Sequence, residues 1–170
     1  KLTLGHAYEL ADAKMLVEQG LKVLAHNIRD RAVDSDFKAV LKQRNVTLIP
    51  TLIRDEFLFA YGDAPAWIDD PFFQKFVPAE RLAVLKTKIR DEQAKNPQRA
   101  LIKAGFEMNK INLKKLSDGG VRIALGTDSG GAADRFFVQG YSEHREMELM
   151  VQSGLTPMQV IQSFSKGASE

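Results

Sequence analysis

The sequence predicts an α/β fold built on a parallel sheet, and two observations lead to that prediction. Four short apolar runs have strand character, at residues 2–4, 21–25, 46–49 and 121–125. Segments in which apolar residues recur at helical spacing follow the first two runs and the last one. Strands and helices therefore alternate along the chain, as they do where crossover helices join parallel strands.

The two N-terminal helices are predicted from the spacing of their apolar residues and from their ends. The residues expected on the buried faces are Leu10, Ala13 and Val17 in the first helix and Phe37, Val40 and Leu41 in the second. Gly20 is expected to stop the first helix, because glycine readily takes the backbone conformation that ends one. Residues 34–36 (Asp-Ser-Asp) are expected to cap the second helix.

Two more helices are predicted near the C-terminus. One carries His144, Met147 and Val151 on a single face and ends near Gly154. The other starts within residues 156–159 (Thr-Pro-Met-Gln), which combine a capping box with proline at the first helical position. His144 is expected to pack or to face solvent on its helix rather than to bind a metal.

Residues 54–118 interrupt the alternation, and we interpret them as an insertion between the third and fourth strands of a single domain, 1–170. The stretch is much longer than a usual connection. It begins with seven aromatic residues: Phe57, Phe59, Tyr61, Trp67, Phe72, Phe73 and Phe76. It then becomes charged and amphipathic, with Leu82, Leu85 and Ile89 at helical spacing. Two compatible roles are open: an extra helical layer, or a lid or pocket wall over a substrate.

The composition excludes several classes of protein. With 44% hydrophobic and 27% charged residues, the 170-residue chain has the balance of a soluble globular protein. No apolar run approaches the ~18 residues of a membrane span. The net charge of +2 is too small, and its basic residues too scattered, to indicate a nucleic-acid partner. The absence of cysteine excludes disulfides, a thiol nucleophile and cysteine-ligated zinc.

Both ends of the sequence look cut. It begins without Met, inside an apolar alternation, and it stops just past a predicted helix. We therefore expect a piece of a longer protein. No compartment is assigned, because a targeting signal upstream is compatible with this expectation.

Three potential metal ligands follow predicted strands in the same way. His6 and His26 each follow an apolar run, twenty residues apart, and Asp128 follows the last run. The carboxyl ends of parallel strands meet at one edge, so these side chains are expected to face one another. Two imidazoles and a carboxylate are a normal ligand set for zinc or a similar divalent ion. Each residue alone also has a plainer interpretation, as a hydrogen-bonded structural histidine or a turn-forming aspartate.

A different hypothesis concerns residues 126–131, which read Gly-Thr-Asp-Ser-Gly-Gly. They suit an anion-binding turn, because the last strands of barrels often hold phosphate. Such a site would need neither His6 nor His26, whereas a metal site needs both.

The motifs at the four strand ends resemble those of the amidohydrolase superfamily, above all the enzymes similar to imidazolonepropionases and prolidase-like carboxypeptidases. They are His6-Ala7-Tyr8, Ala25-His26, Pro50-Thr51-Leu52 and Gly126-Thr127-Asp128-Ser129-Gly130. Residues 144–149 and 154–157 resemble the last barrel helices of that group. The resemblance covers nearly the whole chain, and residues 54–118 match it weakly.

The resemblance implies a (β/α)8 TIM barrel of which this chain forms the last four units, with the insertion added. It implies that His6 and His26 bind the second of two divalent metals or its equivalent and that Asp128 binds the first, with zinc the expected metal; whether the site holds one metal or two stays open. It also implies that Asp128 acts as general base on water and that Tyr8 contacts a small-molecule or peptide-like substrate. A plain packing role for Tyr8 is equally compatible with the sequence.

The chain departs from the family in one important respect. It contains no His-x-His pair, which the family carries on its first strand, and it begins after the fourth strand would have ended. We therefore expect a fragment of a metal-dependent hydrolase of C–N bonds that is inactive alone, with self-association or a missing N-terminal half completing it. The alternative is a non-catalytic half-barrel that binds a metal or an anion.

Overall fold

The computed structural model describes residues 2–130 and 136–169, with a four-stranded parallel sheet in the order β1-β2-β3-β4. The elements are, in chain order, β1 (Leu4–His6), α1 (Leu10–Glu18), β2 (Val23–Ala25), α2 (Ser35–Gln43), β3 (Thr47–Ile49), α3 (Leu52–Glu56), η1 (Ala60–Asp63), η2 (Ala66–Asp69), α4 (Pro71–Gln74), α5 (Ala79–Val84), the π-helical turn η3 (Leu85–Ile89), α6 (Arg90–Ala94), α7 (Arg99–Asp118), β4 (Arg122–Ile123), α8 (Tyr141–Gln152), α9 (Pro157–Phe164) and α10 (Lys166–Ser169). The predicted α/β class and parallel sheet are confirmed.

β2, β3 and β4 are shorter than the apolar runs that predicted them, and β1, which is as long as its run, is shifted by two residues. β1 pairs with β2 only from Leu4 to His6, so His6 lies within the strand rather than after it. β4 ends at Ile123, because the N–H of Leu125 donates to the carbonyl of Ser163 in α9 instead of continuing the ladder. Hydrogen-bond partners from a neighbouring helix thus decide where this strand ends.

The predicted helices form with the ends that their sequences indicate. Asp34 caps α2 by accepting a hydrogen bond from the Phe37 N–H at 2.8 Å. Thr156 caps α9 in a capping box with Gln159. Gly20 and Gly154 follow α1 and α8 with φ of +98°, the left-handed conformation that terminates a helix at little cost in glycine.

Helices and helical turns fill the chain between β3 and β4. Aromatic side chains hold their first half together: the Trp67 ring packs against Phe57, Tyr61 and Phe73 with centroid distances of 5.1–5.7 Å. Phe57, Tyr61 and Phe73 are buried. Tyr61 also donates its hydroxyl proton to the Phe136 carbonyl at 2.7 Å, so this layer supports the segment that leads to α8.

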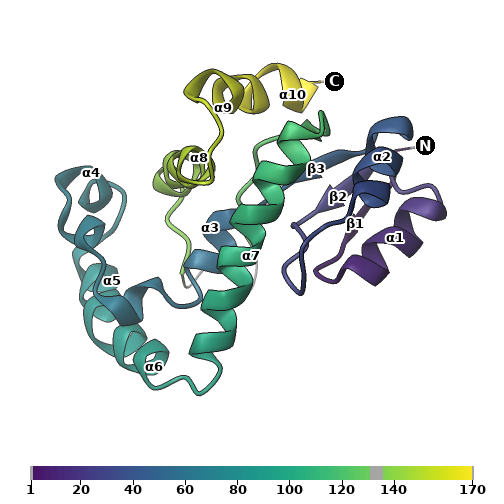
Figure 1. Ribbon diagram of the computed structural model, residues 1–170. Helices are drawn as coiled ribbons and strands as arrows, with labels where there is room; N and C mark the ends of the chain where they lie inside the picture. The colour runs from purple at the N-terminus through teal and green to yellow at the C-terminus, as the bar shows by residue number, and fades with distance from the viewer. Residues whose placement is uncertain (1, 131–135, 170) are drawn as a thin grey trace.

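The 20-residue helix α7 lies between the sheet and the group formed by α4, α5 and α6 (Figure 1). α3 packs against both α7 and α8. Buried hydrophobic side chains of the strands and the surrounding helices form one continuous core. Among the helices that the structure describes, none combines the length and apolar character needed to cross a membrane.

Candidate functional site

His6 and His26 meet at the carboxyl edge of the sheet. His6 is the last residue of β1, and His26 directly follows β2. His6 Nδ1 lies 2.7 Å from His26 Nε2. The other ring nitrogen of His26, Nδ1, lies 2.7 Å from the hydroxyl of the buried Thr51. When Nδ1–H donates to that hydroxyl, Nε2 keeps its lone pair, which is how protein partners orient a metal-binding imidazole.

Asp128 completes the group that the sequence predicts. Its Oδ2 lies 4.0 Å from His26 Nε2 and 3.4 Å from Nε of Arg54. The segment before it runs close to β3: a Cβ built on Gly126 would lie 2.5 Å from Cγ2 of Ile49. Glycine therefore allows the approach that brings Asp128 to the two imidazoles.

Left-handed backbone conformations gather at this edge. His26, Thr51 and Asp128 have φ of 69°, 48° and 60°, and they are three of the five non-glycine residues with positive φ in the part of the chain that the structure describes. Such conformations cost free energy and persist where the surrounding fold enforces them, often at functional sites. The three residues each follow a different strand of the sheet.

The electrostatics keep His26 neutral. The pKa of His26 is lowered to about 4, mainly by burial and then by the Arg54 guanidinium, while the Asp128 carboxylate opposes the change. Because a neutral imidazole is the form that binds a metal, His26 is a competent ligand at neutral pH. Its contact with Asp128 is not an ion pair under these conditions.

Tyr8 lies between the imidazole pair and two arginines. Its ring stacks on His26 with a centroid distance of 4.8 Å and an interplanar angle of 13°. Cζ of Arg29 lies 3.8 Å from the Tyr8 ring centroid, and that of Arg54 lies 4.9 Å from it. Burial raises the pKa of the Tyr8 phenol, with the two arginines opposing, so the group stays protonated at neutral pH. The ring is held in place from both faces.

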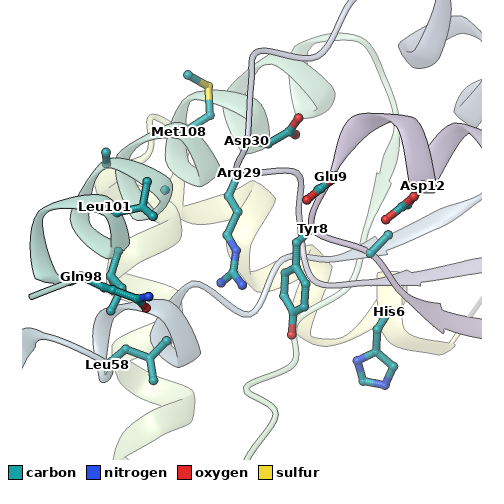
Figure 2. Close-up of a pocket in the computed structure, with 14 residues that line it drawn as sticks. His6, Tyr8, Glu9, Asp12, Arg29, Asp30, Leu58, Gln98, Leu101 and Met108 are labelled. Carbon is teal, nitrogen blue, oxygen red and sulfur yellow. The ribbon is translucent and has the colours of Figure 1, made fainter. Parts of the chain in front are cut away.

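A cavity of about 820 Å³ opens beside these residues. His6, Tyr8 and Arg29 line one part of it, and residues of α7 line the opposite part. Figure 2 shows the side chains of Tyr8 and Arg29 next to each other, with Leu101 across from them. Of the three predicted ligands, only His6 is among the residues that line this cavity, and His26 and Asp128 are not.

The donor atoms match a divalent cation in chemistry but do not form a finished site. Zinc holds imidazole nitrogens at about 2.0–2.1 Å, so two of them on one tetrahedral ion lie roughly 3.3 Å apart. The two imidazole nitrogens here, at 2.7 Å, need to separate by about half an ångström to admit one. Within residues 2–130 and 136–169, no three His, Asp or Glu side chains are arranged as a ready metal site. His6, His26 and Asp128 thus fit as a partial ligand set.

Several residues of this site were not predicted. Asp55 is buried and accepts hydrogen bonds from Arg29 at 2.6 Å and from Arg54 at 3.0 Å. Arg29 and Arg54 each follow a strand-end residue, His26 and Thr51, by three positions, and that placement was the available signal. His144, by contrast, is exposed on α8 with its ring edge-on to Phe72, as predicted. Gly131 of the proposed anion turn lies outside the described residues.

Comparison with known proteins supports the fold. No protein-family model and no curated protein matches the sequence. Solved structures similar to the chain include a Xaa-Pro dipeptidase with bound methionine in its active site (20% identity, TM-score 0.61, 99% of this chain and 33% of that one). An amidohydrolase is also similar, with 20% identity and a TM-score of 0.61 over 99% of this chain and 32% of that one. So is an A. niger ochratoxinase, with 17% identity and a TM-score of 0.63 over 98% of this chain and 29% of that one.

These matches cover nearly all of this chain but only about a third of the length of the other chains. At these identities the likeness concerns the fold: the chain is folded like part of an amidohydrolase-type barrel enzyme. The resemblance that the strand-end motifs indicated is therefore confirmed for the fold.

Proposed function

We propose that this chain is the part of a metal-dependent C–N hydrolase that supplies His6, His26 and Asp128, and that it forms the last four β/α units of a (β/α)8 barrel. The observation that carries the proposal is the imidazole pair at the carboxyl edge of the sheet, with one nitrogen of each ring 2.7 Å from the other. Active sites of barrels lie at this edge. The bond cleaved would be an amide, peptide or cyclic amide.

His6, His26 and Asp128 would hold the cation, with zinc the ion that best matches two imidazoles and a carboxylate. Such a cation polarises a carbonyl group and makes water more acidic. Asp128 would accept a proton from water and return it to the leaving amine. Its side chain is 40% exposed, so its carboxylate is open to a reacting molecule. Tyr8, fixed beside His26, would contact the substrate.

The chain by itself offers only part of the ligand set, so we propose that it is inactive alone. A matching half, or a second copy, would supply further ligands.

The alternative is a half-barrel without catalytic activity that binds a metal or, at residues 126–131, an anion. The left-handed backbone at Asp128 and Gly130, with φ of 60° and 108°, favours an anion-binding turn there.

Zinc titration of the chain tests the metal site. We expect His6→Ala and His26→Ala to weaken zinc binding at least tenfold, because each deletes a ligand. His144→Ala is the matched control: it removes the third histidine, which lies on α8, and should leave binding unchanged. Equal weakening in all three variants would exclude this site. Phosphate binding that survives the His6 and His26 substitutions would favour the anion-binding alternative.

The role of Asp128 is tested in the longer enzyme by measuring kcat across a zinc titration. Asp128→Asn should lower kcat by about 10²–10⁴-fold, because an amide cannot accept and return a proton near neutral pH. Excess zinc should restore part of the activity of His6→Ala and His26→Ala but not of Asp128→Asn. Equal recovery of all three variants would mean that Asp128 is a ligand without a role as base.

A further inference from the structure

The turns that follow β2 and β3 set the orientation of the His26 ring. His26 and Thr51 have left-handed backbones, with φ of 69° and 48°, and His26 Nδ1 lies 2.7 Å from the Thr51 hydroxyl. Such a conformation costs free energy in residues other than glycine, so neighbouring contacts have to hold it. The contacts of the chain neighbours Asn27 and Pro50 lead to one residue of α7, Asn109.

Asn27, which directly follows His26, is anchored to α7. It is fully buried. Its Nδ2 donates to the backbone carbonyl of Asn109 at 3.0 Å, and its Oδ1 accepts from the N–H of Ile28 at 2.8 Å. The peptide after His26 therefore cannot rotate freely without breaking one of these hydrogen bonds.

The side chain of Asn109 reaches the second turn. Its Nδ2 donates to Oδ2 of Asp55 at 3.1 Å and lies 3.5 Å from the carbonyl oxygen of Pro50, at the long limit of a hydrogen bond. Pro50 directly precedes Thr51, and Asp55 belongs to α3, which begins after Thr51. Both partners are acceptors, so only the nitrogen of the amide can face them. Asn109 thus contacts both turns, one through its backbone and the other through its side chain.

The other atom of the Asn109 amide has no partner. The residue is fully buried, and within residues 2–130 and 136–169 no donor contacts its Oδ1. A buried acceptor without a donor destabilises a folded chain. The contacts of the amide nitrogen with the second turn therefore explain this asparagine better than a contribution to stability does.

We propose that Asn109 is a positioning residue, which ties the turns after β2 and β3 to α7 and so keeps the His26 ring in one orientation and one tautomer. Its consequence for metal binding rests on the proposed function. Residues that orient a ligating imidazole commonly change metal affinity by about 10–100-fold. Asn109 acts through Asn27 and Thr51 rather than by touching the ring, so we expect an effect at the lower end of that range.

The test is the ¹⁵N NMR spectrum of the His26 ring, recorded in EDTA at pH 7. In a fixed neutral tautomer one ring nitrogen carries the proton and the other does not, so their chemical shifts lie far apart. Exchange between the two tautomers brings the shifts together. We expect well separated shifts in the unaltered chain and a separation at least twofold smaller in Asn109→Ala. Averaged shifts in the unaltered chain, or an unchanged separation in Asn109→Ala, would overturn the proposal.

Asn112→Ala is the matched control. Asn112 lies three positions further along α7 and is equally buried, but its hydrogen bonds go to the later part of the loop after β2. This variant should lose at least as much stability to urea as Asn109→Ala and still keep the His26 shifts apart. An equal loss of the separation in both variants would mean that general loosening around α7, and not Asn109, frees the ring.

Asn27→Ala gives a second measurement that does not depend on the folding of Asn109→Ala. It removes the hydrogen bond to the Asn109 carbonyl and leaves the Asn109 amide in place, and it should also bring the His26 shifts together. An unchanged separation in folded Asn27→Ala would contradict the tie between α7 and the turn after β2.

Zinc titration of the longer enzyme measures the consequence for metal binding. Asn109→Ala should weaken zinc binding about tenfold, and Asn112→Ala should leave it unchanged. Equal zinc affinities in both variants and the unaltered enzyme would overturn the role of Asn109 in metal binding. Because the ring spectra need neither metal nor turnover, an enzyme that binds no zinc would count against the proposed hydrolase and not against the positioning of His26.

Discussion

Glu146 is the most deeply buried carboxyl group near the site. It lies on α8 with no exposed surface and accepts hydrogen bonds from the N–H groups of Leu52 and Ile53, at 2.9 and 2.6 Å. These bonds join α8 to the first turn of α3, directly after Thr51. Two effects oppose each other: burial and the neighbouring carboxylates of Asp55 and Glu56 favour the protonated form, while the two N–H donors favour the ionised form.

Burial is the larger effect and raises the pKa of Glu146 to about 8. An unfolded glutamate has a pKa of about 4.3. Between these values the folded chain holds a proton that the unfolded chain has lost. The free energy of unfolding should therefore fall as the pH rises through this window, by up to about 1.4 kcal/mol per unit. Glu146→Gln lacks this titration.

The measurement is the free energy of unfolding in urea from pH 4.5 to 8.5, taken as the difference between the unaltered chain and Glu146→Gln. A decline of this difference with pH is expected. A constant difference would mean that the pKa of Glu146 is not raised. A rising difference would mean that the helix N–H groups, and not burial, control the carboxyl group.

At the residue scale, the sequence was sufficient to predict that His6, His26 and Asp128 lie close together, but not to predict what surrounds them. Each of the three follows an apolar run, and position along a parallel strand fixes where such side chains meet. Thr51 and Asp55 contact the site through a left-handed turn and a short helix. Their roles depend on backbone angles and on long-range contacts that no local pattern encodes.

At the scale of elements, a buried ion pair joins α3 to α8. Arg145 donates to both carboxylate oxygens of Glu56, at 2.9 and 2.6 Å, and to Glu148 at 2.7 Å. The side chains of Arg145 and Glu56 are 12% and 9% exposed, whereas that of Glu148 is 60% exposed. The same guanidinium thus has one buried partner and one exposed partner.

We expect Glu56→Gln to lower the free energy of unfolding by about 3 kcal/mol, because it leaves a buried charge without its bidentate partner. Glu148→Gln is the matched control and should change it by less than about 1 kcal/mol, as exposed pairs do. Urea unfolding of both variants at pH 7 is the measurement. Equal losses would contradict the difference that we attribute to burial.

The helices whose ends carry capping residues were predictable from sequence, since caps and stops act locally. The region between β3 and β4 was predictable only as helical and aromatic. Asn112 of α7 explains why: its amide group contacts the carbonyls of Ile28 and Arg31, at 2.9 and 2.8 Å, and accepts from Val33 N–H at 2.9 Å. These partners lie about eighty positions earlier in the chain, and only the folded chain brings them together.

At the scale of the whole molecule, the sheet remains open. Among the described strands, β1 and β4 each pair on one side only. Leu2 and Leu4, before and within β1, are 79% and 56% exposed. An unpaired strand edge with exposed apolar side chains favours association with another chain. The longer proteins that the fold matches have further chain with which to cover such an edge, as this chain spans about a third of their length.

We therefore expect the chain alone to self-associate at about 10 µM, measured by sedimentation velocity. Pairing of a β1 edge with the edge of a second copy would satisfy free backbone groups and cover Leu2 and Leu4. Leu4→Lys should shift the population toward monomer, because a lysine on a strand edge disfavours pairing with another strand. Leu101→Ser, which removes an exposed leucine from α7 rather than from the sheet, is the control and should leave association unchanged. A single sharp monomer peak for the unaltered chain would show that the open sheet does not drive association. An equal shift in both variants would place the contact elsewhere than at β1.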